Sequence, residues 1–282
     1  MWKQQFIETS RGRFEIFGCG SGEPLCITHL YSEFNERGYY FADAFVESFT
    51  VYLVNLKEAG NSSKVEADVE LSMVETAKDL EAIRASIGLE KWAFAGHSTG
   101  GMLGLVYAIL FPDSLSKLMI GGAAASREYM DHEGSMYCPK SPLNSRLKEI
   151  LAILKSPEAA LEEKRAVNQE WTDLSLYKPE NRNDYFSKPS SGKVIQKRLD
   201  YFSFHELPPF DLRADLPNIV TPAIVYGGRH DVQCPFVFSE EIYESLGKAK
   251  LYEFKESNHV PYLEEREKFA EMVKDFSKWA SK

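Results

Sequence analysis

The sequence predicts an α/β protein with a mostly parallel central sheet, helices on both faces of that sheet, and an inserted helical cap. Two observations carry this prediction. Strand-like and helix-like patterns alternate in the first and last thirds of the 282 residues, which is typical of a parallel sheet covered on both faces. The middle third, from about residue 124 to residue 216, has helical patterns and no convincing strand.

The expected strands are short runs of apolar or β-branched residues. In chain order they cover residues 14–17, 25–29, 51–55, 92–95, 117–120, 223–226 and 251–254. Helical patterns separate most of these runs. Because parallel strands need a long crossover connection, this spacing indicates parallel pairing.

The clearest helix is expected over residues 72–87, where Met73, Leu80 and Ile83 recur at helical spacing. Gly88 follows and can adopt the left-handed conformation that ends many helices. Other helical patterns cover residues 101–110, 147–154, 157–171, 236–246 and 264–280.

The helical middle third divides the chain into two parts. Residues 1–123 and 217–282 are expected to form one α/β core, and residues 124–216 to form a cap inserted between two of its strands. Ligands of parallel α/β sheets bind at the carboxyl ends of the strands. A cap inserted there would form the roof of a binding site.

Composition excludes several classes of protein. The chain is 44% hydrophobic and 27% charged, which are ordinary values for a soluble globular protein. Lys plus Arg is 33 and Asp plus Glu is 42, so the formal charge is 33 − 42 = −9. An acidic chain without a dense Lys/Arg run is not expected to bind nucleic acid or an anionic membrane.

Signals for export, membrane insertion and metal binding are missing from the sequence. The first residues lack the apolar stretch of a signal peptide, and no run approaches the eighteen or so apolar residues of a membrane span. The four cysteines make no CxxC pair. We therefore expect a cytoplasmic enzyme with reduced thiols, no metal, no cofactor and a small-molecule substrate, with assembly into a homo-oligomer left open.

The strongest motif is Gly96-His97-Ser98-Thr99-Gly100, which fits G-x-S-x-G between an expected strand and an expected helix. A serine on such a sharp turn has a strained backbone, so the residues two positions away must be small. Gly96 and Gly100 meet this requirement. The following helix points its N-terminal amides at the site, which favours negative charge there. The motif therefore predicts that Ser98 is a nucleophile.

A nucleophilic serine needs a base that a third group orients. Of the six histidines, His259 follows the last expected strand, in a loop that can reach the serine. His97 lies inside the turn, where its side chain points away from the position of a base. Asp231 follows the preceding strand and lies between Ser98 and His259 in the chain, the order found in this type of fold. We predict Ser98, Asp231 and His259 as a catalytic triad.

Three segments carry a resemblance to the α/β-hydrolase fold superfamily over essentially the whole chain. They are GHSTGG at 96–101, GRHDVQCP at 228–235 and NHVPYLEE at 258–265. The resemblance implies an α/β-hydrolase fold, serine hydrolase chemistry and the same triad. Within the superfamily, the paired glycines after the serine and the aspartate loop ending in Cys234-Pro235 are similar to those of proline iminopeptidases.

Two segments depart from the proline iminopeptidase pattern. The His-Gly-Gly-Pro-Gly of that subgroup corresponds here to HLYSE at 29–33, and its Asp-x-Arg-Gly-x-Gly-x-Ser corresponds to NLKEAGNS at 55–62. The substrate is therefore not carried over from that subgroup.

The resemblance also implies an oxyanion hole made of two backbone amides. One is the amide of Thr99, directly after the nucleophile. When His29 is matched to the histidine of the family's His-Gly, the second donor is the amide of Tyr31 or, failing that, of Leu30. Tyr31 can also extend its hydroxyl over the site as an extra donor, or simply line the pocket.

Residues that contact the substrate give a weaker signal. A peptidase of this type needs buried carboxylates to hold a free α-amine. Glu170, beside Trp171 in the expected cap, is the candidate, although a charged helical face explains most acidic residues of the cap. Together with His97 and Tyr31, these two residues complete the predicted substrate contacts.

The residues thus predict a serine hydrolase that cleaves a small ester or amide through an acyl-enzyme on Ser98, either an esterase or a proline iminopeptidase-like aminopeptidase. The same triad on this fold also serves carbon–carbon bond hydrolases, lyases and cofactor-free oxygenases. A ligand-binding protein with vestigial catalysis is the other alternative.

Overall fold

The computed structural model describes residues 1–279 and is built around an eight-stranded sheet. Its strand order is β1-β2-β5-β3-β6-β7-β9-β10, with parallel pairing from β5 to β10 and antiparallel pairing of β2 with both β1 and β5. The predicted mostly parallel sheet is therefore confirmed. The strands are β1 (Lys3–Thr9), β2 (Gly12–Gly20), β3 (Glu23–Ile27), β5 (Phe49–Val54), β6 (Trp92–His97), β7 (Leu115–Gly121), β9 (Ala223–Gly228) and β10 (Ala249–Phe254).

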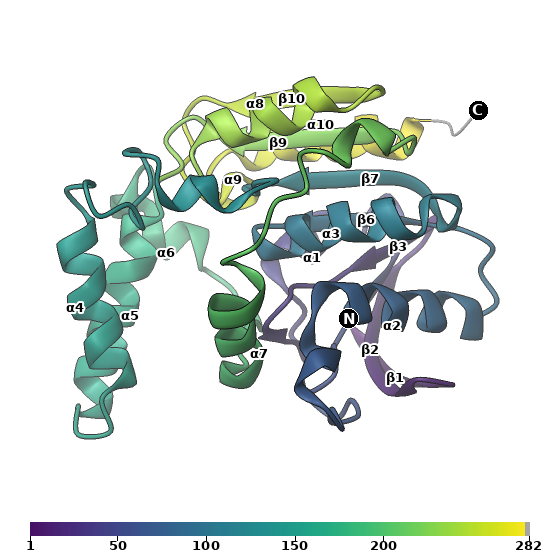
Figure 1. Ribbon diagram of the computed structural model, residues 1–282, viewed down its shortest axis with the longest axis horizontal. Coiled ribbons are helices and arrows are strands. Elements are labelled where there is room, and N and C mark those ends of the chain that lie inside the picture. Colours follow the sequence, from purple (N-terminus) through teal and green to yellow (C-terminus); the bar gives the residue numbers. More distant parts are fainter. Residues whose placement is uncertain (280–282) are drawn as a thin grey trace.

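Helices cover both faces of this sheet (Figure 1). Side chains of a strand point alternately to opposite faces, and β6 shows how the faces are divided. Trp92 and Phe94 belong to one buried apolar cluster, with α2 (Met73–Ser86), α3 (Thr99–Leu110) and α8 (Phe236–Ser245). Ala93 and Ala95 belong to a second cluster, with α1 (Tyr40–Asp43) and α10 (Arg266–Lys278). The shorter helices of the core are η1 (Asp68–Leu71), η2 (Pro112–Ser114), η6 (Leu216–Asn218) and α9 (Pro261–Glu264).

The segment between β7 and β9 is mostly helical, and we propose that its residues 124–216 form the cap. In it, α4 (Asn144–Lys155) and α5 (Leu161–Leu174) pack side by side and project away from the sheet, while α7 (Gln196–Tyr201) lies against the core (Figure 1). A π-helical turn, η5 (Phe202–Glu206), continues α7. The remaining elements are η3 (Arg127–Met130), η4 (Pro179–Asn181), α6 (Arg182–Tyr185) and the two-residue strand β8 (Lys193–Val194).

The structure differs from the sequence-based expectation in three places. All seven expected strands are present, but β1 was missed because it is a largely exposed edge strand with polar residues. The expectation of no strand in the middle third is wrong for β8, which pairs with β4 (Ser32–Glu33) and is too short to show a period. The last expected helix is divided into α9 and α10, and its residue 280 lies outside the described residues.

Candidate active site

Ser98 sits at the sharp turn between β6 and α3 with a strained backbone, φ 55° and ψ −128°. The neighbouring glycines are required by close contacts between backbone segments. A Cβ atom on Gly96 would lie 2.1 Å from the carbonyl oxygen of Gly100, and one on Gly100 would lie 2.6 Å from that of Thr28. The turn therefore tolerates only glycine at these two positions. This steric requirement explains the two glycines of the sequence motif.

Asp231 and His259 follow β9 and β10 and form a buried pair. The Nδ1 atom of His259 lies 2.8 Å from Oδ2 of Asp231. The other carboxylate oxygen accepts the backbone N–H groups of Gln233 at 2.8 Å and Cys234 at 2.9 Å. Because a carboxylate only accepts hydrogen bonds, the neutral imidazole carries its proton on Nδ1 and leaves Nε2 free to accept one.

A cavity of about 350 Å³ is lined by Ser98, Thr99, His259 and Tyr31. Its other walls are mainly apolar and come from α3, η3, the loop before α4, the helical hairpin α4–α5, and the segment from β8 to the residue after η5. These apolar residues are Met102, Tyr129, Met130, Tyr137, Leu151, Trp171, Val194, Leu199, Phe202, Phe204 and Leu207. A second cavity of about 990 Å³ adjoins it and shares Leu151, Trp171 and Phe204 among its walls. The serine and the Asp231–His259 pair therefore meet at one largely apolar cavity.

The loop after β3 brings a chain of polar side chains to the start of α3. The His29 ring lies between Oγ of Ser32, 2.9 Å from its Nδ1, and Oγ1 of Thr99, 3.1 Å from its Nε2. Burial, reinforced by the nearby His259, lowers the pKa of His29 to about 3, so the ring is neutral at physiological pH. Within residues 1–279, the backbone amides of Tyr31 and Thr99 have no hydrogen-bond partner. Thr99 follows the serine directly in the chain, and Tyr31 shares the cavity wall with it.

His97 is buried and is not among the residues that line the cavity. Its Nδ1 is 2.9 Å from the hydroxyl of Tyr226, and its ring centroid is 4.7 Å from that of His259. Burial, together with the neighbouring histidines, keeps the pKa of His97 well below its usual range. The side chain is absent from the walls of the cavity and supports the ring of His259 from behind.

The family described as alpha/beta hydrolase fold matches residues 28–265. The chain belongs to the α/β hydrolase fold family. An alpha/beta fold family hydrolase from Bacillus anthracis str. Sterne is 47% identical to this hydrolase, superposes with a TM-score of 0.96, and matches over 98% of this chain and 99% of that chain. The resemblance seen in the sequence is thus confirmed at the level of the family.

More distant relatives of this α/β hydrolase carry different names. A proline iminopeptidase from Heyndrickxia coagulans is 22% identical over 98% of this chain and 99% of its own length. An esterase from Exiguobacterium antarcticum is 23% identical, with a TM-score of 0.71, over 98% of this chain and 100% of that chain. The predicted relationship to proline iminopeptidases is therefore confirmed. At such identities, the structural likeness to the esterase extends to the fold alone.

The structure places the other predicted site residues of this hydrolase in different surroundings. Tyr31 and Trp171 line the cavity. Leu30 is fully buried, and its carbonyl oxygen accepts a hydrogen bond from Arg198. Glu170 faces away from the cavity and forms a two-pronged ion pair with Arg146, with N–O distances of 2.6 and 2.7 Å. Glu170 and His97 are therefore not carried into the proposed substrate site.

Two features of this hydrolase were missed in the sequence. Ser175, at the end of α5, accepts the backbone N–H of His259 through its carbonyl oxygen at 3.2 Å. Arg198, on α7, is a buried arginine beside the loop after β3. Neither has a local signature, since each acts on residues far away in the chain. No helix within residues 1–279 is long and apolar enough to cross a membrane.

Proposed function

We propose that this α/β hydrolase cleaves small esters with an apolar acyl group, through an acyl-enzyme formed on Ser98. The observation that carries the proposal is the convergence of the strained serine and the Asp231–His259 pair on one cavity. A strained serine turn and a buried, oriented imidazole are the two parts that serine hydrolysis requires.

In the proposed mechanism, Nε2 of His259 takes the proton of the Ser98 hydroxyl as Oγ bonds to the ester carbonyl carbon. The resulting oxyanion accepts hydrogen bonds from the free amides of Thr99 and Tyr31. The tetrahedral intermediate then collapses, and the alcohol leaves with the proton held by His259. Water attacks the acyl-enzyme in the same way and releases the acid. Asp231 fixes the tautomer of His259 and stabilises its charged form.

The walls of the cavity favour an ester over an N-terminal peptide bond. A free α-amine is an ammonium ion, and burying it without carboxylate partners costs several kcal/mol. Among the described residues, Asp200 is the one carboxylate on the cavity wall, so an ammonium ion would find a single acidic partner there. Glu170 is paired with Arg146 outside the cavity. The lining, mainly apolar with Lys155 as its cation, thus suits an apolar acyl group without an ammonium.

The first test of this proposal compares wild type with Ser98→Ala. We expect a fluorophosphonate probe to label wild type alone, and the substitution to lower ester turnover by about 10⁴-fold or more. Ser245→Ala is the matched control, because its hydroxyl only caps the end of α8 by donating to the Glu241 carbonyl oxygen at 2.8 Å. Equal labelling of wild type and Ser98→Ala contradicts the nucleophile assignment.

A substrate panel tests the proposed acyl group. p-Nitrophenyl esters of graded acyl length are compared with proline and alanine arylamides on the same enzyme preparation. We expect kcat/KM to rise from acetate to a medium-length acyl chain and to be low for both arylamides. Stronger cleavage of the proline arylamide overturns the ester assignment in favour of a peptidase. Ligand binding without any turnover overturns the enzymatic proposal as a whole.

A further inference from the structure

Arg198 is a cation buried between α7 and the core, with 2% of its surface exposed. Its four hydrogen bonds go to neutral oxygens. Nε donates to the carbonyl oxygen of Leu30, and Nη1 to that of Lys57 at 3.1 Å. Nη2 donates to the carbonyl oxygen of Leu71 at 3.4 Å and to Oγ1 of Thr76 at 2.9 Å. One side chain therefore joins α7 to three segments of the core.

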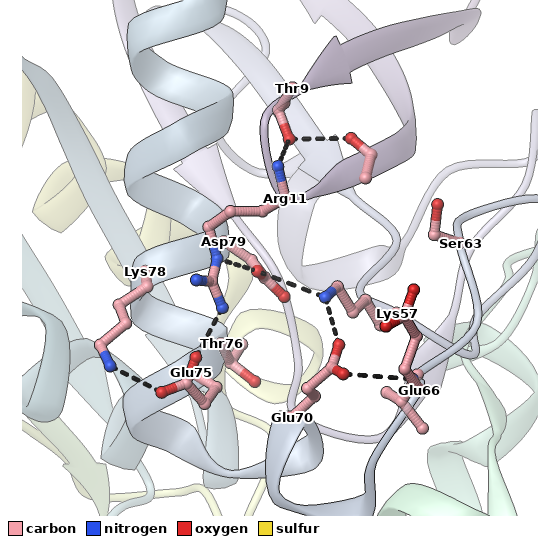
Figure 2. A network of polar contacts seen from close by, with 12 residues as sticks. Thr9, Arg11, Lys57, Ser63, Glu66, Glu70, Glu75, Thr76, Lys78 and Asp79 are labelled. Carbon is pink, nitrogen blue, oxygen red and sulfur yellow. Dashed lines mark hydrogen bonds and ion pairs between the residues drawn. The ribbon is translucent and has the colours of Figure 1, made fainter.

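Arg198 remains charged although it is buried. Figure 2 shows the polar network that includes Lys57 and Thr76, two partners of Arg198. In this network Arg11 contacts Asp79 at 2.6 Å and Lys57 contacts Glu70 at 2.5 Å. Burial lowers the pKa of Arg198 to about 10, against the attraction of nearby carboxylates of which Asp79 is the strongest. The guanidinium is thus a full cation at neutral pH, held in a low-dielectric position.

The bond from Arg198 to Leu30 fixes the direction of one peptide unit. In a trans peptide, the C=O and the following N–H point in opposite directions. With the Leu30 carbonyl turned toward Arg198, the Tyr31 N–H is turned away from it, and this amide has no partner among the described residues. The next carbonyl, that of Tyr31, accepts the Ile195 N–H at 2.8 Å, so α7 and the residue before it hold both sides of Tyr31.

A cation bound to a peptide carbonyl also strengthens the donor at the other end of the same peptide, because hydrogen bonds in series polarise one another. We propose that Arg198 is a positioning residue that aims and polarises the Leu30–Tyr31 peptide so that the Tyr31 amide stabilises the oxyanion. The inference rests on the proposed esterase function. It gives the region proposed as the cap a part in the chemical step besides enclosing the substrate.

The test measures kcat and KM separately for p-nitrophenyl butyrate hydrolysis by Arg198→Met, with active enzyme counted by fluorophosphonate titration. We expect kcat to fall about 10- to 100-fold, since losing a whole oxyanion donor costs about 100- to 1000-fold. KM should stay within about threefold, because the donor acts mainly in the transition state. Butylboronic acid, which forms a tetrahedral adduct on the serine, should bind weaker by a factor similar to the loss in kcat.

Three further variants separate positioning from folding. Arg198→Lys keeps the cation, so its kcat should lie between those of wild type and Arg198→Met. It replaces Arg198→Met as the test variant if Arg198→Met does not fold. Thr76→Val removes one partner of Arg198 without touching Leu30, and should lower the unfolding midpoint while leaving kcat within about twofold. Arg182→Met removes an arginine of the proposed cap that pairs with Asp173, and should leave both kinetic constants unchanged.

The outcomes distinguish the inference from the proposed function. If wild type neither hydrolyses the ester nor binds the boronic acid, the proposed function fails. If wild type does both and the Arg198 variants match it in kcat, the positioning role alone is overturned. Equal losses of kcat in Arg198→Met and Thr76→Val overturn it as well, because they point to general destabilisation.

Discussion

The two sides of the candidate active site are held in different ways. On one side, Asp231 is fixed by amides two and three residues further along its own loop, and its partner His259 is 28 positions away. On the other side, the Leu30–Tyr31 peptide is held by Arg198, 168 positions away in the proposed cap. The support of the Asp231 carboxylate is local and belongs to the core, although the His259 amide also donates to the Ser175 carbonyl of the proposed cap. The support of the Leu30–Tyr31 peptide is distant and depends on how α7 docks.

This difference separates two kinds of vulnerability. A substitution of Asp231 acts directly on the imidazole that its carboxylate contacts. A substitution of Arg198 reaches the site through the Leu30–Tyr31 peptide, so the geometry of the proposed oxyanion amide depends on a residue that is not on the cavity wall. The predictions below test each side and then a residue that belongs to neither.

Asp231→Asn gives the largest expected effect, because it removes the carboxylate that orients the His259 imidazole. The amide can still accept the N–H groups of Gln233 and Cys234, but it can donate to Nδ1 of His259 and so favours the wrong tautomer. We expect kcat for ester hydrolysis to fall about 10⁴-fold. The unfolding midpoint should change little, and thermal denaturation checks this. A loss below tenfold contradicts the assignment of Asp231 as the orienting acid.

The sequence predicts the residues of the Asp231 side well, because Ser98, Asp231 and His259 lie within short motifs, although it misses the Ser175 contact to His259. The glycines beside Ser98 follow from the steric demands of the turn, and the two contacts of their absent Cβ atoms show why. Asp231 and His259 each come directly after a recognisable strand, so their meeting at the carboxyl edge of the sheet follows from strand order. The mostly parallel sheet was predictable for the same reason.

On the other side, the resemblance points to Tyr31 or Leu30, but the contacts that hold them are beyond sequence reasoning because they have no period and no spacing rule. Arg198 lies in a polar helix, where an arginine is expected to be exposed to solvent. It is instead buried and bonded to three segments of the core. The strand β8 has two residues, too few for alternation to appear. Glu170 looked like an amine ligand because it stands beside Trp171, but its partner Arg146 is on another helix. In all three cases the partner lies far away in the chain: backbone pairing with β4 holds β8, and side-chain contacts hold Arg198 and Glu170.

His29→Gln tests the Leu30 side through the pH dependence of the free energy of unfolding. Burial lowers the pKa of His29 to about 3 from 6.5, so below pH 6.5 the unfolded chain binds a proton that the folded protein excludes. The free energy of unfolding therefore falls as the pH drops from about 6.5 toward 3. Between pH 7 and pH 5 the contribution of this one group is about 2 kcal/mol.

Urea unfolding of wild type and His29→Gln at pH 7 and pH 5 measures this contribution. We expect the loss of unfolding free energy on acidification to be smaller in His29→Gln by about 2 kcal/mol. His97, also buried and neutral, is present in both proteins and cancels in the comparison. Identical pH dependence in the two proteins contradicts the picture of a neutral His29 buried beside Thr99.

The smallest effect is expected for Glu170→Gln, which touches neither side of the site. Its carboxylate pairs with Arg146 on the outer surface of the α4–α5 hairpin, where solvent screens the ion pair. We expect kcat and KM for esters to stay within about twofold of wild type.

Trp171→Ala, one position further along and on the cavity wall, is the contrasting variant. It should raise KM about tenfold, because apolar contact with the substrate is lost. A rise in KM for proline arylamides in Glu170→Gln, with esters unaffected, would instead make this carboxylate an amine ligand and reopen the peptidase reading.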